Sequence, residues 1–313
     1  MRKAPGFTAL GIALLFVTGC AAPAQPAAPA PAPTPTRAAL APAALGDGGR
    51  IAVALKSGSG ASILTVNPDG SDLRKLTQPQ AFDACPDLGP GGTLIAFCSD
   101  RSGVLEIWLM DGSGGSQRRL TTLGGDSIFP DISPDGQRVA FCGSPTSQDD
   151  HDIWVINVDG TGLVQLTNTV GPNDCDPVWS PDGSALLFDS TRSGTPELYR
   201  MDATGQGVTQ LTSGQQVGLE PPDWSPNGQQ IAYIAQGAVW TMKADGSEQR
   251  RLTTGDGEDY APAWSPKGNE IVYRHSDKDG LSLRIVSVST GQVRQVPLGD
   301  GAAPLAPSWQ QAS

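Results

Sequence analysis

A seven-residue segment recurs five times along the chain and constrains the fold more than any other feature. Its pattern is proline, two variable residues, serine or glycine, a second proline, any residue and glycine, and its copies occupy 86–92, 130–136, 177–183, 222–228 and 262–268. The second prolines of successive copies are 44, 47, 45 and 40 residues apart. A period of about 40–45 residues is the length of one four-stranded β-propeller blade. The repeat therefore predicts a ring of blades.

Each period also carries the same series of strand signals. A short apolar run follows the Pro-x-Gly turn, at 95–97, 139–141, 186–188, 231–233 and 271–273. A third strand rich in β-branched and aromatic residues comes next, at 107–110, 153–156, 198–201 and 239–242. A glycine-containing turn then leads to an outer strand ending in Leu-Thr. Runs of this composition between Asp-Gly and Pro-x-Gly turns indicate strands and hairpins, so the fold is predicted to be all-β.

The two ends of the repeat region complement each other. Residues 50–53 match a second strand and 63–66 a third strand, so the first blade lacks its inner strand. At the other end, Pro307-Ser308-Trp309 matches the inner strand and follows Trp264 by 45 residues. Pairing this C-terminal strand with the first blade would close the ring and remove its open edges. We therefore predict a six-bladed β-propeller of four-stranded blades over residues 46–313.

These repeats resemble the WD40-like repeats of the TolB propeller family, from about Gly46 to Trp309. The resemblance implies the propeller fold and an interaction surface around one mouth of the central channel. The α/β domain that precedes the propeller in TolB has no counterpart in this sequence, so we do not expect a literal TolB role. Lipoproteins that carry such repeats alone are, by the same resemblance, usually binding modules.

The N-terminal residues have the layout of a secretory signal. Arg2 and Lys3 precede an apolar stretch, 7–17, that is too short to span a bilayer. It ends in Val-Thr-Gly-Cys at 17–20, which resembles a bacterial lipobox with Cys20 as the lipidated residue. We expect a signal peptide over 1–19 and an Ala/Pro-rich tether over 20–45 that places the protein outside a bacterial membrane. An ordinary signal with a chance cysteine is the alternative.

Charge and histidine content limit the functions to consider. Without residues 1–19 the chain has 19 basic and 32 acidic side chains, a formal charge near −13, which disfavours nucleic-acid binding. The chain has two histidines and no Gly-x-Ser-x-Gly motif. We therefore predict a monomeric, non-enzymatic propeller that needs no cofactor.

One set of acidic residues is a candidate binding site at the channel mouth. Asp83, Asp174 and Asp259 each lie five residues before the inner-strand Trp or its substitute, and Asp126 and Glu220 are displaced by one residue. Tyr260 follows Asp259 and is placed to contact a ligand. Converging carboxylates would raise each other's pKa unless a cation intervenes, and oxygen ligands suit Ca²⁺. Asp83, Asp174 and Asp259 are thus candidate metal ligands. The alternative is that these residues are solvated turn formers.

Four cysteines remain besides Cys20, and an oxidising envelope favours two disulfides. Cys85 and Cys98 fall on adjacent strands of one blade, whereas Cys142 and Cys175 fall on neighbouring blades. We expect the pairs Cys85–Cys98 and Cys142–Cys175, although buried free thiols would also fit a core.

The sequence thus predicts an envelope lipoprotein whose propeller rim binds a protein partner of unknown identity. A small-ligand or Ca²⁺ sensor acting through the central channel is the first alternative. A polysaccharide- or peptide-processing enzyme is the second.

Overall fold

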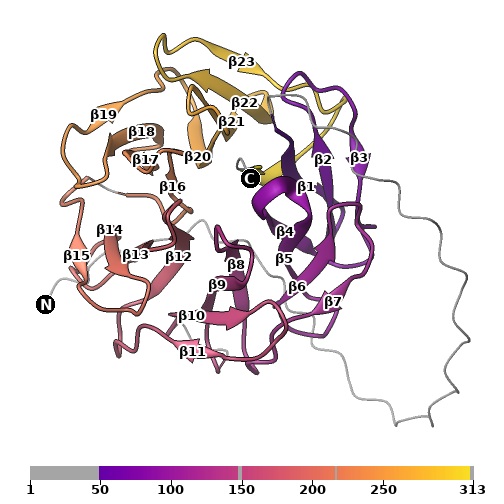
Figure 1. The fold of residues 1–313 in the computed structure, drawn as a ribbon. Coiled ribbons are helices and arrows are strands. Elements are labelled where there is room, and N and C mark those ends of the chain that lie inside the picture. The colour runs from indigo at the N-terminus through magenta and orange to yellow at the C-terminus, as the bar shows by residue number, and fades with distance from the viewer. Residues whose placement is uncertain (1–48, 147–149, 216, 311–313) are drawn as a thin grey trace, which may run out of the picture. The chain divides into compact units, whose positions relative to one another are not determined.

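The computed structural model describes residues 49–146, 150–215 and 217–310. The predicted signal peptide, Cys20 and the tether lie outside the described residues. The described part contains six antiparallel sheets of four strands each, arranged around a central axis (Figure 1). This confirms the predicted six-bladed β-propeller.

We number the blades along the chain by their sheets, so that blade 1 has the strand order β24-β1-β2-β3 and blade 6 has the order β20-β21-β22-β23. The inner strands of blades 1–6 are β24 (Pro304–Trp309), β4 (Asp83–Leu88), β8 (Ser127–Ile132), β12 (Asp174–Trp179), β16 (Asp223–Trp224) and β20 (Glu258–Trp264). The second strands are β1 (Ile51–Ser57), β5 (Leu94–Ser99), β9 (Arg138–Gly143), β13 (Ala185–Ser190), β17 (Gln230–Ala235) and β21 (Glu270–Asp277).

The third strands are β2 (Gly60–Val66), β6 (Glu106–Asp111), β10 (Asp152–Asn157), β14 (Glu197–Asp202), β18 (Ala238–Lys243) and β22 (Gly280–Ser287). The outer strands are short: β3 (Arg74–Lys75), β7 (Arg118–Arg119), β11 (Val164–Gln165), β15 (Thr209–Gln210), β19 (Arg250–Arg251) and β23 (Val293–Gln295). One 3₁₀ turn, η1 (Pro90–Gly92), lies between β4 and β5. No helix among the described residues is long and apolar enough to cross a membrane.

The ring closes as the sequence predicts. Strand β24 pairs antiparallel with β1, with Ile51 opposite Trp309 and Val53 opposite Pro307. The amide of Gln310 also donates to the carbonyl of Arg50 at 2.9 Å. The first blade therefore takes its inner strand from the C-terminal part of the chain.

The Leu-Thr signature has a local structural cause. In each of five blades the threonine is buried, and its hydroxyl oxygen accepts the amide N–H of the third strand. For example, Ile107 donates to Thr121 and Val239 donates to Thr253, both at 2.9 Å. These bonds fix the end of each outer strand against the strand inside it.

The hydrophobic core lies between neighbouring blades. Its largest buried members come from two positions of the repeat, the inner-strand Trp and the aromatic of the second strand. Trp264, Phe97 and Tyr273 are each at most 2% exposed. Truncating a core aromatic of this kind costs about 3–5 kcal/mol. The repeated tryptophans therefore serve packing.

The cysteines confirm one predicted disulfide and correct the other. Cys142 of blade 3 and Cys175 of blade 4 are bonded. Cys85 and Cys98 are free thiols, so the second predicted disulfide is not formed. The register explains the difference, because Ala84 lies opposite Cys98 and Cys85 falls within a bulge. The two thiols still meet, and this contact together with burial raises the pKa of Cys85 well above its usual value.

Candidate functional site

The inner strands bulge where they line the central channel. Their pairing with the second strand shifts register just before the repeated proline, and the residue before that proline has a positive φ of 46–54° in four blades. These residues are Cys85, Phe129, Asp176 and Ala261. A bulge bends its strand and re-aims the following side chains. The bulges thereby direct the proline and the residue after it toward the axis.

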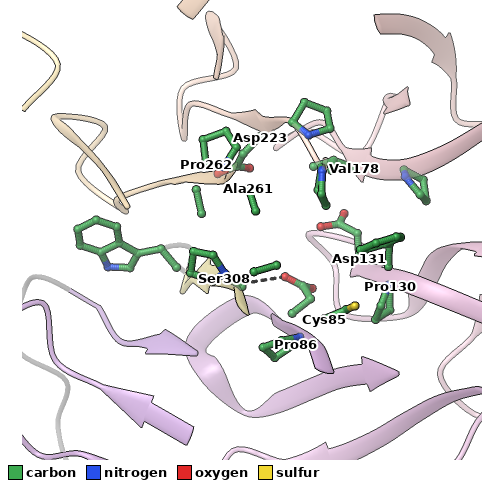
Figure 2. A pocket seen from close by; sticks show the side chains of 18 residues that line it. Cys85, Pro86, Pro130, Asp131, Val178, Asp223, Ala261, Pro262 and Ser308 are labelled. Atoms are coloured by element: carbon green, nitrogen blue, oxygen red, sulfur yellow. Dashed lines mark hydrogen bonds between the residues drawn. The ribbon is translucent and has the colours of Figure 1, made fainter. Parts of the chain in front are cut away.

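The channel contains a cavity of about 100 Å³. A proline from every blade lines it: Pro86, Pro130, Pro177, Pro222, Pro262 and Pro307. The polar lining comes from the residue after the proline, which is Asp in blades 2, 3 and 5 and Ser308 in blade 1. Figure 2 shows Asp131 of blade 3 and Asp223 of blade 5 beside this space.

These polar side chains link neighbouring blades, because each accepts a backbone amide N–H of the next blade. We call such a hydrogen bond a clasp. Asp87 accepts the amide N–H of Ile132 in the next blade at 2.8 Å. Asp131 accepts that of Trp179 at 2.8 Å, and Asp223 accepts that of Trp264 at 2.6 Å. The acceptor between blades 1 and 2 is Ser308, whose Oγ takes the amide N–H of Leu88 at 3.1 Å and donates to Asp87 at 3.1 Å (Figure 2).

Two blades lack this clasp, because the equivalent residues are Val178 in blade 4 and Ala263 in blade 6. An aliphatic side chain has no oxygen to offer the amide of the following blade.

Burial makes the clasping carboxyl groups weak acids. Desolvation raises the pKa of Asp87 to about 6 and that of Asp223 to about 8, against the lowering effect of their backbone hydrogen bonds. The pKa of Asp131 is raised well above its ordinary value by burial and by the negative charge of Asp87. Near neutral pH the channel therefore carries carboxyl groups that can hold a proton.

Two of the predicted site residues, Asp83 and Asp174, are engaged within their own blades. Asp83 pairs with Arg101 at 2.7 Å, and Asp174 pairs with Arg192 at 2.8 Å. Each arginine also lies over two aromatic rings of its blade. These carboxylates therefore already have a cationic partner.

Asp259 has a different partner, although it occupies the same position in blade 6. Its Oδ1 lies 2.6 Å from His275 Nδ1, and its Oδ2 accepts the hydroxyl of Thr253. The other ring nitrogen of His275 lies 3.2 Å from Asp277, which Arg284 contacts at 2.9 Å. Opposite this aspartate, blades 2 and 4 have Ser99 and Ser190 where blade 6 has His275. Two residues further on, blades 2 and 4 have an arginine where blade 6 has Asp277.

Of the remaining predicted residues, Glu220 and Tyr260 are brought together and Asp126 is not. Arg274 links the first two: it lies 3.5 Å from Glu220 and stacks 4.0 Å from the ring centre of Tyr260. Burial raises the pKa of Glu220 to about 7, against the effect of Arg274, and it raises the pKa of Tyr260 to about 12. Asp126 instead accepts the amide of Leu105 at 3.3 Å.

The predicted calcium ligands do not form a shared site. Within residues 49–146, 150–215 and 217–310, no group of three or more His, Cys, Asp or Glu side chains is placed to hold a metal ion. Binding of Ca²⁺ by Asp83, Asp174 and Asp259 stays a prediction that titration would test.

The sequence analysis did not identify a buried carboxyl pair in blade 4. Asp176 and Asp189 are 2% and 1% exposed, and three of their four carboxyl oxygens have no hydrogen-bond partner in the described structure. Burial raises the pKa of Asp189 to about 7, and burial with the neighbouring charge raises that of Asp176. Their contact depends on the bulge in β12, for which the sequence gives no signal.

Comparison with known families identifies the repeat. Residues 35–147 and 125–313 match the family described as the TolB beta propeller domain. This chain belongs to that family. The matched ranges together include all six blades, so family membership rests on the whole ring.

Individual TolB relatives match over shorter stretches. A protein TolB homolog of Chlorobium luteolum is 31% identical over 134 residues, which are 43% of this chain and 30% of that protein. The Tol-Pal system protein TolB of Nitratidesulfovibrio vulgaris is 34% identical over 58 residues, 18% of this chain and 13% of its own length. The matches therefore span less than a third of either TolB relative.

Solved structures agree on the fold. TolB from Acinetobacter baumannii has a TM-score of 0.71 at 23% identity, covering 85% of this chain and 68% of that one. A puromycin-hydrolyzing peptidase of Mycobacterium tuberculosis has a TM-score of 0.57 at 19% identity and covers 80% of this chain and 44% of that one. The TolB-type propeller thus occurs in proteins of different kinds.

Proposed function

We propose that this TolB-family protein is an exported, lipid-anchored envelope protein whose propeller binds a protein partner at one channel mouth. Membership of the TolB propeller family is the observation that carries the proposal. The partner-binding role is non-enzymatic and requires no cofactor. The lipid is attached to Cys20, and the tether holds the propeller outside the membrane.

The cluster of Glu220, Tyr260 and Arg274 supports the position of the binding surface. Tyr and Arg are the residue types that dominate the energetics of protein interfaces. Leu219, next to Glu220, is 52% exposed and adds an apolar contact. A rigid aromatic ring, a guanidinium held over it and an exposed aliphatic side chain are suited to docking a folded partner.

Site-specific crosslinking in the native cells would test this binding surface. A photoreactive residue at 219 or 260 should form a discrete adduct with one envelope protein. The same residue at Val208, which is exposed on the outer side of blade 4, is the matched control. Equal adducts at all three positions, or none at 219 and 260, would refute the channel-mouth surface.

Lipid attachment needs a separate measurement. Metabolic labelling with a fatty acid should label the wild-type chain and leave the Cys20→Ala variant unlabelled. If both chains remained unlabelled while the protein was still exported, the anchor would be wrong and the partner-binding proposal would stand.

The cation-sensor alternative has weaker support. Asp83, Asp174 and Asp259 already have Arg101, Arg192 and His275 as partners, so Ca²⁺ would have to displace an existing interaction. Calorimetric titration with Ca²⁺ of the wild type and of a triple Asp→Asn variant would decide this alternative.

A further inference from the structure

Exposed basic residues gather on the outer strands of four consecutive blades. In ring order from blade 5 through blades 6 and 1 to blade 2, they are Arg250 and Arg251 of β19, Arg294 of β23, Arg74 and Lys75 of β3, and Arg118 and Arg119 of β7. The outer strands of blades 3 and 4 carry Val-Gln and Thr-Gln instead. We call this set of seven residues the basic edge. It follows the rim of the propeller from β19 past β23 and β3 to β7 (Figure 1).

Hydrogen bonds to the next blade hold several of these side chains in place. Arg118 donates to the carbonyl of Val158, Arg250 to that of Val288, and Arg294 to that of Pro68. A carbonyl acceptor fixes a guanidinium without neutralising its charge. Arg118 and Arg250 are therefore held in place and keep their positive charge, whereas Arg294 also contacts the carboxylate of Glu270.

Few carboxylates compensate these charges. Arg74 pairs with Asp72 at 2.8 Å, and Arg294 pairs with Glu270 at 3.1 Å. Among the described residues, no carboxylate forms an ion pair with the other five members of the basic edge. This is notable in a chain whose formal net charge is −11. The positive charge is concentrated on one part of the rim while the molecule as a whole is acidic.

Protection of sheet edges does not account for this distribution. Charged residues on short outer strands prevent edge-to-edge pairing between molecules. That requirement applies equally to β11 and β15, which lack charge. The asymmetry between blades 5, 6, 1 and 2 and blades 3 and 4 requires another explanation.

We propose that the basic edge docks the propeller against the anionic headgroups of the membrane that carries its lipid anchor. The proposal rests on the proposed attachment at Cys20. Because a polypeptide spans at most about 3.5 Å per residue, the residues from Cys20 to Leu45 keep the propeller within about 90 Å of the membrane that holds the lipid. At 0.1 M salt, charges separated by more than about 10 Å are largely screened from each other. Only protein charges close to the bilayer then interact with the headgroups, and the acidic remainder of the molecule is not repelled.

Docking through the rim has a consequence for orientation. Because the outer strands lie at the perimeter of the ring (Figure 1), a flat bilayer touches the basic edge at one or two neighbouring blades at a time, with the channel axis along the membrane plane. Both channel mouths then stay open to a partner, and blades 3 and 4 point away from the bilayer.

Vesicle binding tests the proposal without the lipid. The probe is the chain from residue 20 onward with Cys20→Ser, mixed with phosphatidylcholine vesicles with or without phosphatidylglycerol. We expect sedimentation only with the anionic vesicles and a loss of binding as salt rises. The variant Lys75→Ser/Arg119→Ser should bind about 25-fold more weakly at low salt, since each cation contributes about five-fold.

The control removes the same charge elsewhere. Lys56→Ser/Lys278→Ser alters two exposed lysines near the hairpins that join second and third strands, away from the basic edge. It should retain wild-type binding, and unchanged melting temperatures of both variants would exclude unfolding. Equal binding to neutral and anionic vesicles, or equal losses in both double variants, would overturn the proposal. Because Cys20 is replaced throughout, these outcomes leave the lipid anchor and the partner site untouched.

Discussion

Blades 3 and 4 are fastened to each other in ways that blades 4 and 5 are not. Across the first interface, Asp131 accepts the amide of Trp179, Cys142 is bonded to Cys175, and Arg138 lies 4.4 Å above the Trp179 ring. Across the second interface, Val178 replaces the clasping Asp, and no disulfide is formed among the described residues. The guanidinium of Arg200 is also more distant from its Trp, at 5.9 Å.

Buried carboxyl groups also gather beside the weaker interface. Asp176 and Asp189 lie in blade 4, and their electrostatic neighbours include Glu220, which precedes the two-residue strand β16. Blades 4 and 5 are joined by apolar contacts, such as those of Val178 and Leu187 with Trp224, and by a hydrogen bond from Gln249 Nε2 to the carbonyl of Leu211 at 3.3 Å. The comparison teaches that the interfaces between similar blades are stabilised unequally. Glu220 of the proposed partner site lies beside the weaker of these two interfaces.

Removing the disulfide should have the largest effect, because it breaks the stronger interface. The Cys142→Ser/Cys175→Ser variant releases a crosslink between residues 33 apart, which corresponds to about 3–4 kcal/mol of unfolding free energy. Denaturant unfolding under oxidising conditions would measure the loss. Reductant should not destabilise this variant further, since Cys85 and Cys98 are already thiols. A further loss would show that those two residues are bridged in solution.

Raising the pH should weaken the interface between blades 4 and 5. The pKa values of Asp189 and Glu220 are raised to about 7 by burial, so the folded state holds protons that the unfolded chain releases near pH 4. The stabilisation that protonated Asp189 and Glu220 give the folded state is complete below pH 4 and is lost as the pH rises through 7. We expect these two groups to contribute a fall of about 2–3 kcal/mol in the unfolding free energy between pH 6 and pH 8, in addition to the fall from Asp223, whose pKa is raised to about 8.

Matched variants in blade 4 separate this effect from general pH dependence. Asp189→Asn should reduce the fall, because an amide does not ionise. Hydrogen bonds from Ser180 and Ser184 lower the pKa of Asp182 to about 2. The stabilisation that the ionised Asp182 gives the folded state is therefore lost only in strong acid. Asp182→Asn should therefore leave the change between pH 6 and pH 8 unaltered. An unchanged pH profile in Asp189→Asn would refute the assignment.

Asp131→Ala tests the clasp itself. It leaves the buried amide of Trp179 without its acceptor, and we expect a cost of about 1–2 kcal/mol in thermal or denaturant unfolding. Asp131→Asn keeps an oxygen at the same place and should retain most of the stability. If both variants were equally unstable, the carboxyl group would matter for a reason other than this hydrogen bond.

The smallest expected effect comes from adding a clasp where none exists. Val178→Asp places a carboxyl group where Asp131 and Asp223 stand in their own blades, within reach of the Trp224 amide. Exchange of that amide should slow by up to about ten-fold, even if lost apolar burial offsets the global gain. Hydrogen exchange at the single residue is the measurement.

The fold could be predicted from the sequence because each blade encodes its strands locally. The Pro-x-Gly turns, the Leu-Thr ends and the position of Trp309 were sufficient to predict six blades and their closure. The disulfide between Cys142 and Cys175 followed from the same alignment. The predicted disulfide between Cys85 and Cys98 was wrong because the bulge in β4 places Ala84, and not Cys85, opposite Cys98. Bulges leave no clear signal in the sequence.

The candidate site was less predictable for the same reason. Asp83 and Asp174 were correctly placed on inner strands, but their partners Arg101 and Arg192 come from just beyond the neighbouring strand. The clasping residues can be recognised in the sequence as the Asp that follows the repeated proline. They were not predicted as links between blades, because Pro-Asp is also typical of turns. The contact between Asp176 and Asp189 depends on tertiary geometry alone.

The union of β24 with β1 affects how the protein is made. The strand that completes blade 1 consists of residues 304–309, so the ring cannot close until the residues of all six blades have been synthesised. Until then the edge of β1 has no partner strand and can pair with another chain. The last strand of the ring therefore protects the first.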